Sequence, residues 1–186
     1  MEVKQILKAA EDVMQKAVEH CHIEFAKIRT GRASTNLLDG IRVDYYGEMV
    51  PLSQVASVST PDATMILVQP WEKKLVSVID RAIMAANLGL NPTSDGTVIR
   101  LPIPPLNEER RRELAKVARK IAEDSRVGVR NARRDAMDTL KKAEKEEHMS
   151  EDMRKGGEDD VQKLTDRYIE EVDRVLAEKE KDIMAV

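Results

Sequence analysis

Apolar residues recur three and four positions apart at both ends of the chain, and this spacing constrains the fold more than any other feature of the sequence. In the first segment the recurring residues are Val3, Leu7, Ala10, Met14, Ala17 and Cys21. Such a stripe is typical of a long amphipathic helix that packs against other helices. We expect this helix to end near Arg29-Thr30-Gly31, because glycine readily adopts the left-handed conformation found at helix ends.

A second helical pattern follows Asn107, whose side chain can cap a helix, and Glu108 and Glu109 suit the positive end of the helix dipole. The apolar spacing then continues almost to the C-terminus. Gly156-Gly157 is expected to interrupt it before a last helix. Each of three long amphipathic helices needs a partner for its apolar stripe, so we predict a three-helix bundle made from residues 1–30 and 106–186.

The middle of the chain, residues 31–105, has the short period of β-structure. Ile41, Val43 and Tyr45 occupy alternate positions before a turn at Gly47. The apolar run 65–68 and the segment 97–101 predict further strands.

A helix is expected between these last two strands, from about Glu72 to Leu88-Gly89. Its inward-facing residues are predicted to be Leu75, Val76, Ile79, Ile83 and Met84. Trp71, the lone tryptophan, is expected to pack inside the same region. The middle of the chain is therefore interpreted as a small mixed domain of strands plus a helix.

Two connectors join this domain to the helical ends. Three prolines within residues 102–105 can neither continue a helix nor donate ladder hydrogen bonds, so they predict a stiff segment. The other connector is the stretch 29–33, and two connectors side by side make a plausible hinge. The residues assigned to the hinge are Arg29, Thr30, Gly31, Arg32, Pro102, Pro104 and Pro105.

Composition narrows the class of protein. The 186-residue chain has a net charge of -3, and its single cysteine excludes an internal disulfide. The first residues lack the apolar core of a signal peptide and no run could span a bilayer, so a cytoplasmic protein without membrane contact is expected. Cys21 lies between His20 and His22, but successive helical side chains point about 100° apart and cannot share a metal ion. We expect no metal site, no cofactor and no catalytic residues.

Basic residues gather on one face of the long helix that follows Asn107. Residues 107–135 hold ten Lys or Arg against six Asp or Glu, whereas residues 136–186 hold ten against sixteen. The residues within about 60° of Arg119 on a helical projection are Arg112, Lys116, Arg126, Arg130 and Arg133. We expect this stripe to lie opposite the buried face, where arginine forks could grip a phosphate backbone. A merely solvated helix face is an equal alternative, and Glu123 dilutes the charge.

Longer motifs resemble those of one family. They are Lys27–Ser34, Leu37–Gly40, Tyr45–Gly47, Leu88–Pro92, Pro102–Leu106, Val129–Asp135 and Asp159–Asp166. In this order and spread over the whole chain, they closely resemble bacterial ribosome recycling factors. Thr35 and Gly128 are small departures, and a glycine inside a helix costs about 1 kcal/mol relative to alanine.

The resemblance implies an α+β fold in which an inserted β/α/β domain and the three-helix bundle form the two arms of an L-shaped, tRNA-like molecule. Members of that family bind the large ribosomal subunit after termination. With elongation factor G, which hydrolyses GTP, they separate the subunits and free messenger RNA and tRNA. The implied factor is a monomer with no catalytic site, and its small domain faces the elongation factor.

The resemblance also implies roles for individual arginines. The principal contacts to ribosomal RNA are expected to be Arg111, Arg130 and Arg133. Supporting contacts are expected from Arg112, Arg119, Arg126 and Arg134. Arg29 and Arg32 could either touch RNA or fix the interdomain angle.

Two other functions remain open at this point. The strict spacing of the first helix would also suit a coiled-coil adaptor, which should be a stable dimer. A factor of similar shape could instead stall or hibernate ribosomes, and binding alone would not separate it from a recycling factor.

Overall fold

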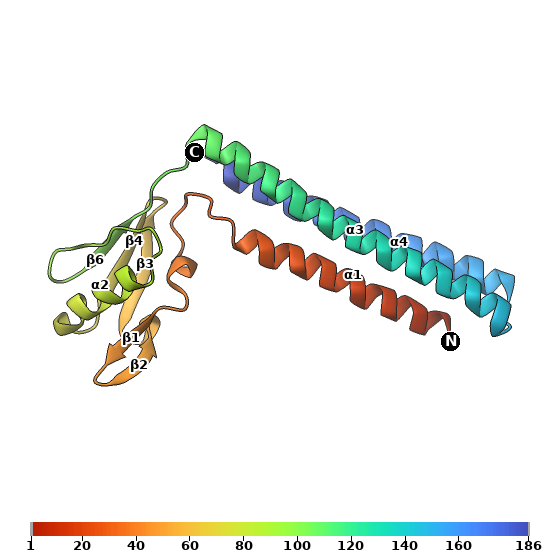
Figure 1. Ribbon diagram of the computed structural model, residues 1–186, viewed down its shortest axis with the longest axis horizontal. Helices are drawn as coiled ribbons and strands as arrows, with labels where there is room; N and C mark the ends of the chain where they lie inside the picture. The colour runs from red at the N-terminus through yellow and green to blue at the C-terminus, as the bar shows by residue number, and fades with distance from the viewer. Residues whose placement is uncertain (1, 186) are drawn as a thin grey trace. The chain divides into compact units, whose positions relative to one another are not determined.

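The computed structural model of the protein describes residues 2–185. The chain folds into two compact units (Figure 1). One unit joins Met1–Thr30 to Glu108–Val186, and the other is Gly31–Asn107. The first contains three long helices, α1 (Val3–Ala26), α3 (Glu108–Glu146) and α4 (Glu151–Met184). Each of them packs against the other two, which confirms the predicted three-helix bundle.

The apolar stripes of the three helices meet inside this bundle. One core cluster, toward the end of the bundle where α3 is followed by α4, is formed by Ile6, Ala10, Ala136, Leu140 and Val161. Because α1 buries its stripe against α3 and α4, that stripe is already partnered within the chain. The helix ends at Ala26, earlier than predicted, and Gly31 takes its left-handed conformation (φ +73°) in the connector rather than at the helix end.

The expected interruption at Gly156-Gly157 is wrong. Both glycines lie inside α4, and the chain instead turns between α3 and α4, where the Ser150 hydroxyl caps α4 by accepting a hydrogen bond from the Met153 N–H at 3.2 Å. Gly157 is buried against the opposite helix. Packing between helices, rather than a turn, explains a glycine there. Within residues 2–185 no helix is long and apolar enough to cross a membrane.

The second unit contains two antiparallel sheets. Strands β1 (Arg42–Tyr45) and β2 (Glu48–Pro51) form a hairpin, and its turn residues Tyr46 and Gly47 both have positive φ, as a type I′ hairpin turn requires. The larger sheet has the order β3-β4-β6-β5, made of β3 (Ala56–Asp62), β4 (Met65–Pro70), β6 (Ile99–Pro102) and β5 (Thr93–Ser94).

Three short 3-10 helices and one α-helix complete this unit. The 3-10 helices are Thr35–Leu38, Leu52–Gln54 and Lys73–Leu75, and α2 spans Val76–Ala85. The fully buried core side chains come from both the strands and α2, namely Val43, Ile66, Val68, Ile79, Ile99 and Leu101. The predicted α+β fold, with a small sheet domain inserted into a helical bundle, is confirmed.

Two predictions of burial in this unit are wrong. Met84 is 63% exposed, because it lies about 100° around α2 from the buried Ile83. Trp71 is 66% exposed, because it follows the last residue of β4 and the chain there runs along the surface.

Both connectors are tied to the turn between β3 and β4. The Ala33 N–H donates to the Ala63 carbonyl at 2.8 Å, and the Ile103 N–H donates to the Thr64 carbonyl at 2.7 Å. Gly31 lies against Leu106, where a Cβ atom would approach Leu106 Cγ to 2.9 Å. Pro102, assigned to the hinge from the sequence, is held in the sheet as the last residue of β6, paired with Met65.

Candidate nucleic-acid interface

The sequence predicted that the arginine stripe of α3 lies opposite the buried face of the helix, and this prediction is wrong. Ala122 is fully buried, yet it lies about 60° around the helix from Arg119. Arg119 donates from Nε to Glu180 of α4 at 2.9 Å, and its side chain is 62% exposed. The arginine stripe therefore follows the boundary between α3 and α4, with one edge against α4 and the other toward solvent.

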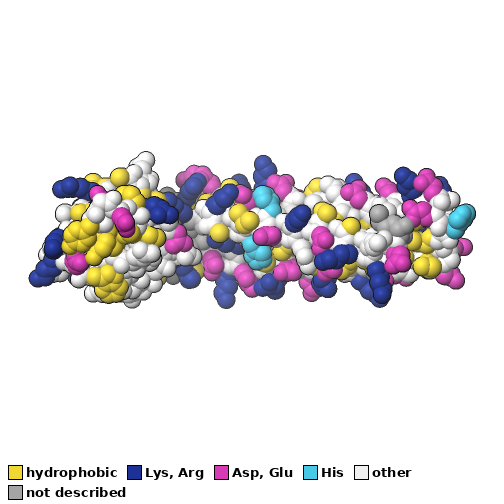
Figure 2. All heavy atoms as spheres, turned by 90° about the horizontal axis from the view of Figure 1, so that it is seen from below, with side chains coloured by type: hydrophobic (Ala, Val, Ile, Leu, Met, Phe, Trp, Pro, Cys, Tyr) yellow, Lys and Arg dark blue, Asp and Glu magenta, His cyan; other side chains and the backbone are white. Residues whose placement is uncertain are grey.

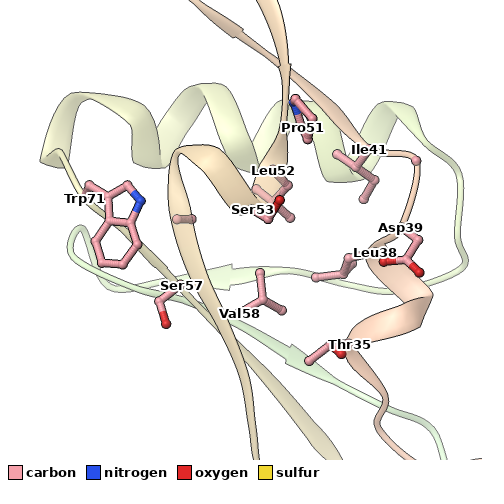
Figure 3. Close-up of a pocket in the computed structure, with 12 residues that line it drawn as sticks. Thr35, Leu38, Asp39, Ile41, Pro51, Leu52, Ser53, Ser57, Val58 and Trp71 are labelled. Carbon is pink, nitrogen blue, oxygen red and sulfur yellow. The ribbon is translucent and has the colours of Figure 1, made fainter.

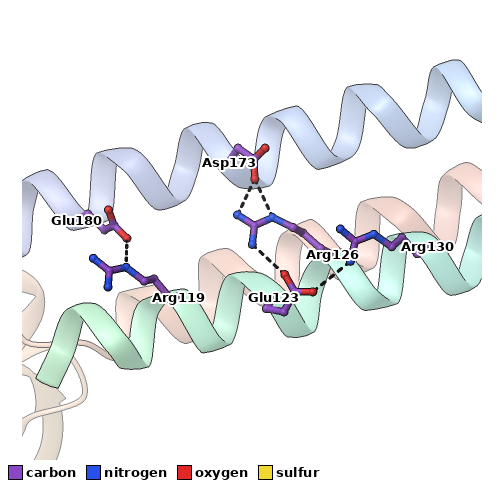
Figure 4. Close-up of polar contacts among 6 residues, drawn as sticks. All are labelled: Arg119, Glu123, Arg126, Arg130, Asp173 and Glu180. Carbon is purple, nitrogen blue, oxygen red and sulfur yellow. Dashed lines mark hydrogen bonds and ion pairs between the residues drawn. The ribbon is translucent and has the colours of Figure 1, made fainter.

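Four side chains at this boundary form a chain of alternating charge (Figure 4). Arg126 reaches Asp173 of α4 through Nη2 at 2.6 Å and through Nε at 2.7 Å. Its Nη1 contacts Glu123 at 3.1 Å, and the other oxygen of Glu123 accepts from Arg130 Nη1, also at 3.1 Å. We call Asp173, Arg126, Glu123 and Arg130 the charge relay.

Exposure differs sharply along the charge relay. The side chain of Arg126 is only 18% exposed, whereas that of Arg130 is 44% exposed. Hydrogen bonds from Arg126 and Arg130 lower the pKa of the Glu123 carboxyl, which keeps it ionised. Burial acts to lower the pKa of the Arg126 guanidinium, but the bonds to Asp173 and Glu123 outweigh it and raise that pKa.

The other predicted RNA contacts occupy three kinds of position. Arg112 and Arg134 are exposed, and Arg112 pairs with Glu108 one turn earlier. Arg133 is half-buried, with Nη1 at 3.4 Å from the Gln162 amide oxygen of α4. Arg111 lies about 80° around α3 from Arg119, and its buried Nε has no hydrogen-bond partner among residues 2–185.

Arg29 and Arg32 flank the boundary between the two units in the first connector, and both are exposed. Figure 2 shows how basic and acidic side chains intermix on one face of the helical unit, while hydrophobic side chains gather on the smaller unit. Basic charge on α3 is thus partly compensated by neighbouring acids. The pairing of Asp173 and Glu180 with these arginines was not foreseen, because the partners lie 47 and 61 residues further along the chain.

A hollow in the surface of the small unit lies beside Trp71 and has a volume of about 470 Å³ (Figure 3). Trp71 and Asp39 stand at opposite ends of it, and Thr35, Ser53 and Ser57 add hydroxyl groups to its lining. Its lining contains no His, Cys, Lys or Arg. A lone carboxylate among hydroxyls offers no paired acid and base.

The histidines of α1 lie as the sequence predicted. His20 and His22 are exposed while Cys21 between them is fully buried, so the three side chains point in different directions. Within residues 2–185 no three His, Cys, Asp or Glu side chains are grouped closely enough to hold a metal ion.

The fold and the site together define a class of protein, a helical bundle with a phosphate-binding type of surface and an inserted small unit. A rigid bundle of three long helices carries an arginine-lined edge suited to a phosphate backbone, and it is joined to a small α+β unit by two connectors.

Comparison with known proteins identifies the family within that class. The family model for ribosome recycling factor matches residues 21–184, and the ribosome-recycling factor of Cupriavidus taiwanensis is 55% identical over 186 residues, with both chains covered completely. The chain belongs to the ribosome recycling factor family.

Solved structures agree with this assignment. A solution structure of the ribosome recycling factor matches with a TM-score of 0.79 and 46% identity, covering 100% of this chain and 99% of that one. A second match has a TM-score of 0.64 and 42% identity and covers both chains completely. That structure comprises models for the T. thermophilus ribosome recycling factor and the E. coli elongation factor G bound to the E. coli post-termination complex.

Proposed function

We propose that this protein binds the large ribosomal subunit after termination and, with elongation factor G and GTP, promotes subunit splitting and release of messenger RNA and tRNA. It acts in the cytoplasm as a monomer, by binding and shape, and the hydrolysis of GTP takes place on the elongation factor. Support comes from the family assignment and from the solved relative described with elongation factor G on a post-termination complex.

The observation that carries the proposal is the arginine edge of α3. Arg119 and Arg130 expose guanidinium groups about three turns apart on one helix, and Arg133 lies one turn beyond. An arginine fork can hold two phosphate oxygens at once, so such an edge suits the backbone of ribosomal RNA. The small unit is then the part of the protein that faces the elongation factor.

Light scattering by purified post-termination ribosomes tests the proposal. We expect splitting only when this protein, elongation factor G and GTP are all present, with each component left out in turn as the control. Binding to ribosomes without splitting, using an elongation factor from a closely related species, would instead favour a factor that stalls or hibernates ribosomes.

A single variant tests the contact edge. Arg133→Glu reverses a charge on that edge, and we expect it to abolish binding to large subunits while leaving the helical circular dichroism signal intact. Lys16→Glu makes the same change in charge at an exposed position of α1 and should bind as the wild type does. If Arg133→Glu binds large subunits as tightly as Lys16→Glu and the wild type do, the arginine edge is not the contact.

A further inference from the structure

Arg126 differs from the neighbouring arginines in having almost no free surface. Its Nε and Nη2 both donate to Asp173 and its Nη1 donates to Glu123, while the side chain is only 18% exposed. A phosphate could reach this guanidinium only by displacing two carboxylates. Arg126 is therefore poorly placed to touch RNA directly.

Arg130 stands at the opposite, solvent-facing end of the charge relay. Among the described residues it is engaged through Nη1 alone, with Glu123, and its side chain is 44% exposed. A guanidinium has five N–H donors in a planar fork, so most of this fork remains available for a phosphate. Glu123 fixes the orientation of the fork, because its other oxygen is held by Arg126.

We propose that Arg126 is a positioning residue: anchored by Asp173 of α4, it holds Glu123, and Glu123 holds the Arg130 fork in the orientation that grips a phosphate of ribosomal RNA. This inference rests on the proposed function and assigns Arg126 a different role from the direct contact expected by resemblance. The bundle itself thereby orients the contact, since the first anchor comes from a different helix.

The direction in which binding affinity changes, when a carboxylate of the relay loses its charge, distinguishes a positioning role from an effect of net charge. The relay contains two guanidinium and two carboxylate groups, so it is electrically neutral as a whole. If Asp173 and Glu123 acted only as negative charges, removing either charge would strengthen binding to a polyanion. If they position Arg130, the same removal weakens binding, because a neutral amide no longer holds the guanidinium in place and a long side chain then loses more rotamer freedom on binding.

Equilibrium binding to purified large ribosomal subunits, at about 0.1 M salt and without elongation factor, tests the relay. We expect Arg130→Gln to lower the affinity about fivefold to tenfold, the effect of losing one phosphate contact. Asp173→Asn should lower it about twofold to fivefold, although Asp173 does not touch Arg130. In the double variant Asp173→Asn should cause no further loss, because both changes disable the same contact.

Glu178→Gln is the matched control. Glu178 also lies on α4 and also pairs with an arginine, but its partner Arg174 is on α4 itself and belongs neither to the relay nor to the arginine edge of α3. This variant should bind as tightly as the wild type or slightly more tightly. The salt dependence gives a second readout: the slope of log affinity against log salt should fall in magnitude by about 0.7 to 0.9 in Arg130→Gln and stay unchanged in Glu178→Gln.

The relay is overturned if Asp173→Asn binds as tightly as the wild type, or if its loss persists in the Arg130→Gln background. Arg126→Lys covers the case in which Asp173→Asn fails to fold, because lysine keeps the charge but lacks the fork that bridges Asp173 and Glu123. It must lower the affinity as Asp173→Asn would. A wild-type protein that does not bind large subunits overturns the proposed function together with the relay. If the wild type binds large subunits normally and the variants bind equally well, only the proposed relay is overturned and the proposed function stands.

Discussion

Gly157 of α4 lies directly against Leu140 of α3. A Cβ atom added at Gly157 would stand 2.9 Å from Leu140 Cδ2 and 3.3 Å from Val3 Cγ1. Leu140 is fully buried in the core cluster that it forms with Ile6, Ala10, Ala136 and Val161, so its methyl groups have little space into which to move. A residue without a side chain is what allows α4 to approach α3 this closely.

Gly157→Ala should therefore destabilise the bundle. Overpacking a full core costs about 1–3 kcal/mol, and the better helix propensity of alanine returns about 1 kcal/mol, so we expect a net loss of up to about 2 kcal/mol. Urea denaturation followed by circular dichroism measures it. Gly156→Ala is the control, because among residues 2–185, apart from the adjacent part of α4 itself, no atom lies within 4 Å of where its Cβ atom would stand, and alanine should stabilise the helix by up to about 1 kcal/mol. The prediction fails if both variants are stabilised.

Asp95 organises the turn between β5 and β6. Its carboxylate accepts hydrogen bonds from the Thr97 and Val98 N–H groups, the Thr97 hydroxyl and the Arg100 guanidinium, at 2.8 to 3.0 Å. The backbone bonds of Val98 and Thr97 do most to hold the pKa of this carboxyl far below its ordinary range. The ionised Asp95 carboxylate is held by these hydrogen bonds only in the folded small unit, so its ionised form stabilises that unit relative to the unfolded chain.

Because the folded pKa is depressed, this stabilisation is fully present above the unfolded pKa of about 3.9 and is lost as the pH falls below it. We expect Asp95→Asn to be less stable than the wild type at pH 7. The difference between the two proteins should shrink progressively below about pH 4, where the carboxyl group of the unfolded wild-type chain takes up a proton while that of the folded protein is still ionised. Denaturation of both proteins at several pH values measures this difference, and a constant difference from pH 7 to pH 2 would contradict the assignment.

Cys21 should react with thiol reagents only when the bundle opens. The residue is fully buried in α1, and burial raises the pKa of its thiol, so both access and the reactive thiolate are suppressed. The native protein should resist a disulfide reagent that modifies the denatured protein at once. Labelling should be faster in Gly157→Ala, by about tenfold for each 1.4 kcal/mol lost if reaction follows global unfolding. Equal labelling rates in the folded and denatured protein would contradict the burial of Cys21.

The sequence predicted what depends on local periodicity and missed what depends on packing between distant elements. The period of the apolar stripe was enough to place Ala10, Met14 and Cys21 in the bundle core. It could not distinguish a glycine that ends a helix from Gly157, which admits a neighbouring helix, because the difference lies in Leu140 on another element.

The candidate site shows the same division. Helical geometry placed the arginines of α3 on one stripe, but their partner Asp173 lies 47 residues away on another helix, and no pattern along the chain connects the two. Only the packing of α3 on α4 shows that Arg126 is enclosed while Arg130 is open to solvent. The prediction that Trp71 is buried fails for a different reason. Large apolar residues are usually buried, but this rule does not hold for every one of them.

The exposure of Trp71 leads to a simple spectroscopic prediction. Since it is the lone tryptophan and 66% exposed, acrylamide should quench the fluorescence of the native protein nearly as well as that of the denatured protein. Trp71→Phe should change the free energy of unfolding by less than about 1 kcal/mol, whereas Ile66→Ala, at a fully buried position of β4, should lose about 2–5 kcal/mol. Strong protection from acrylamide would mean that Trp71 is covered in solution, and a large loss in Trp71→Phe would mean that the small unit depends on it for stability.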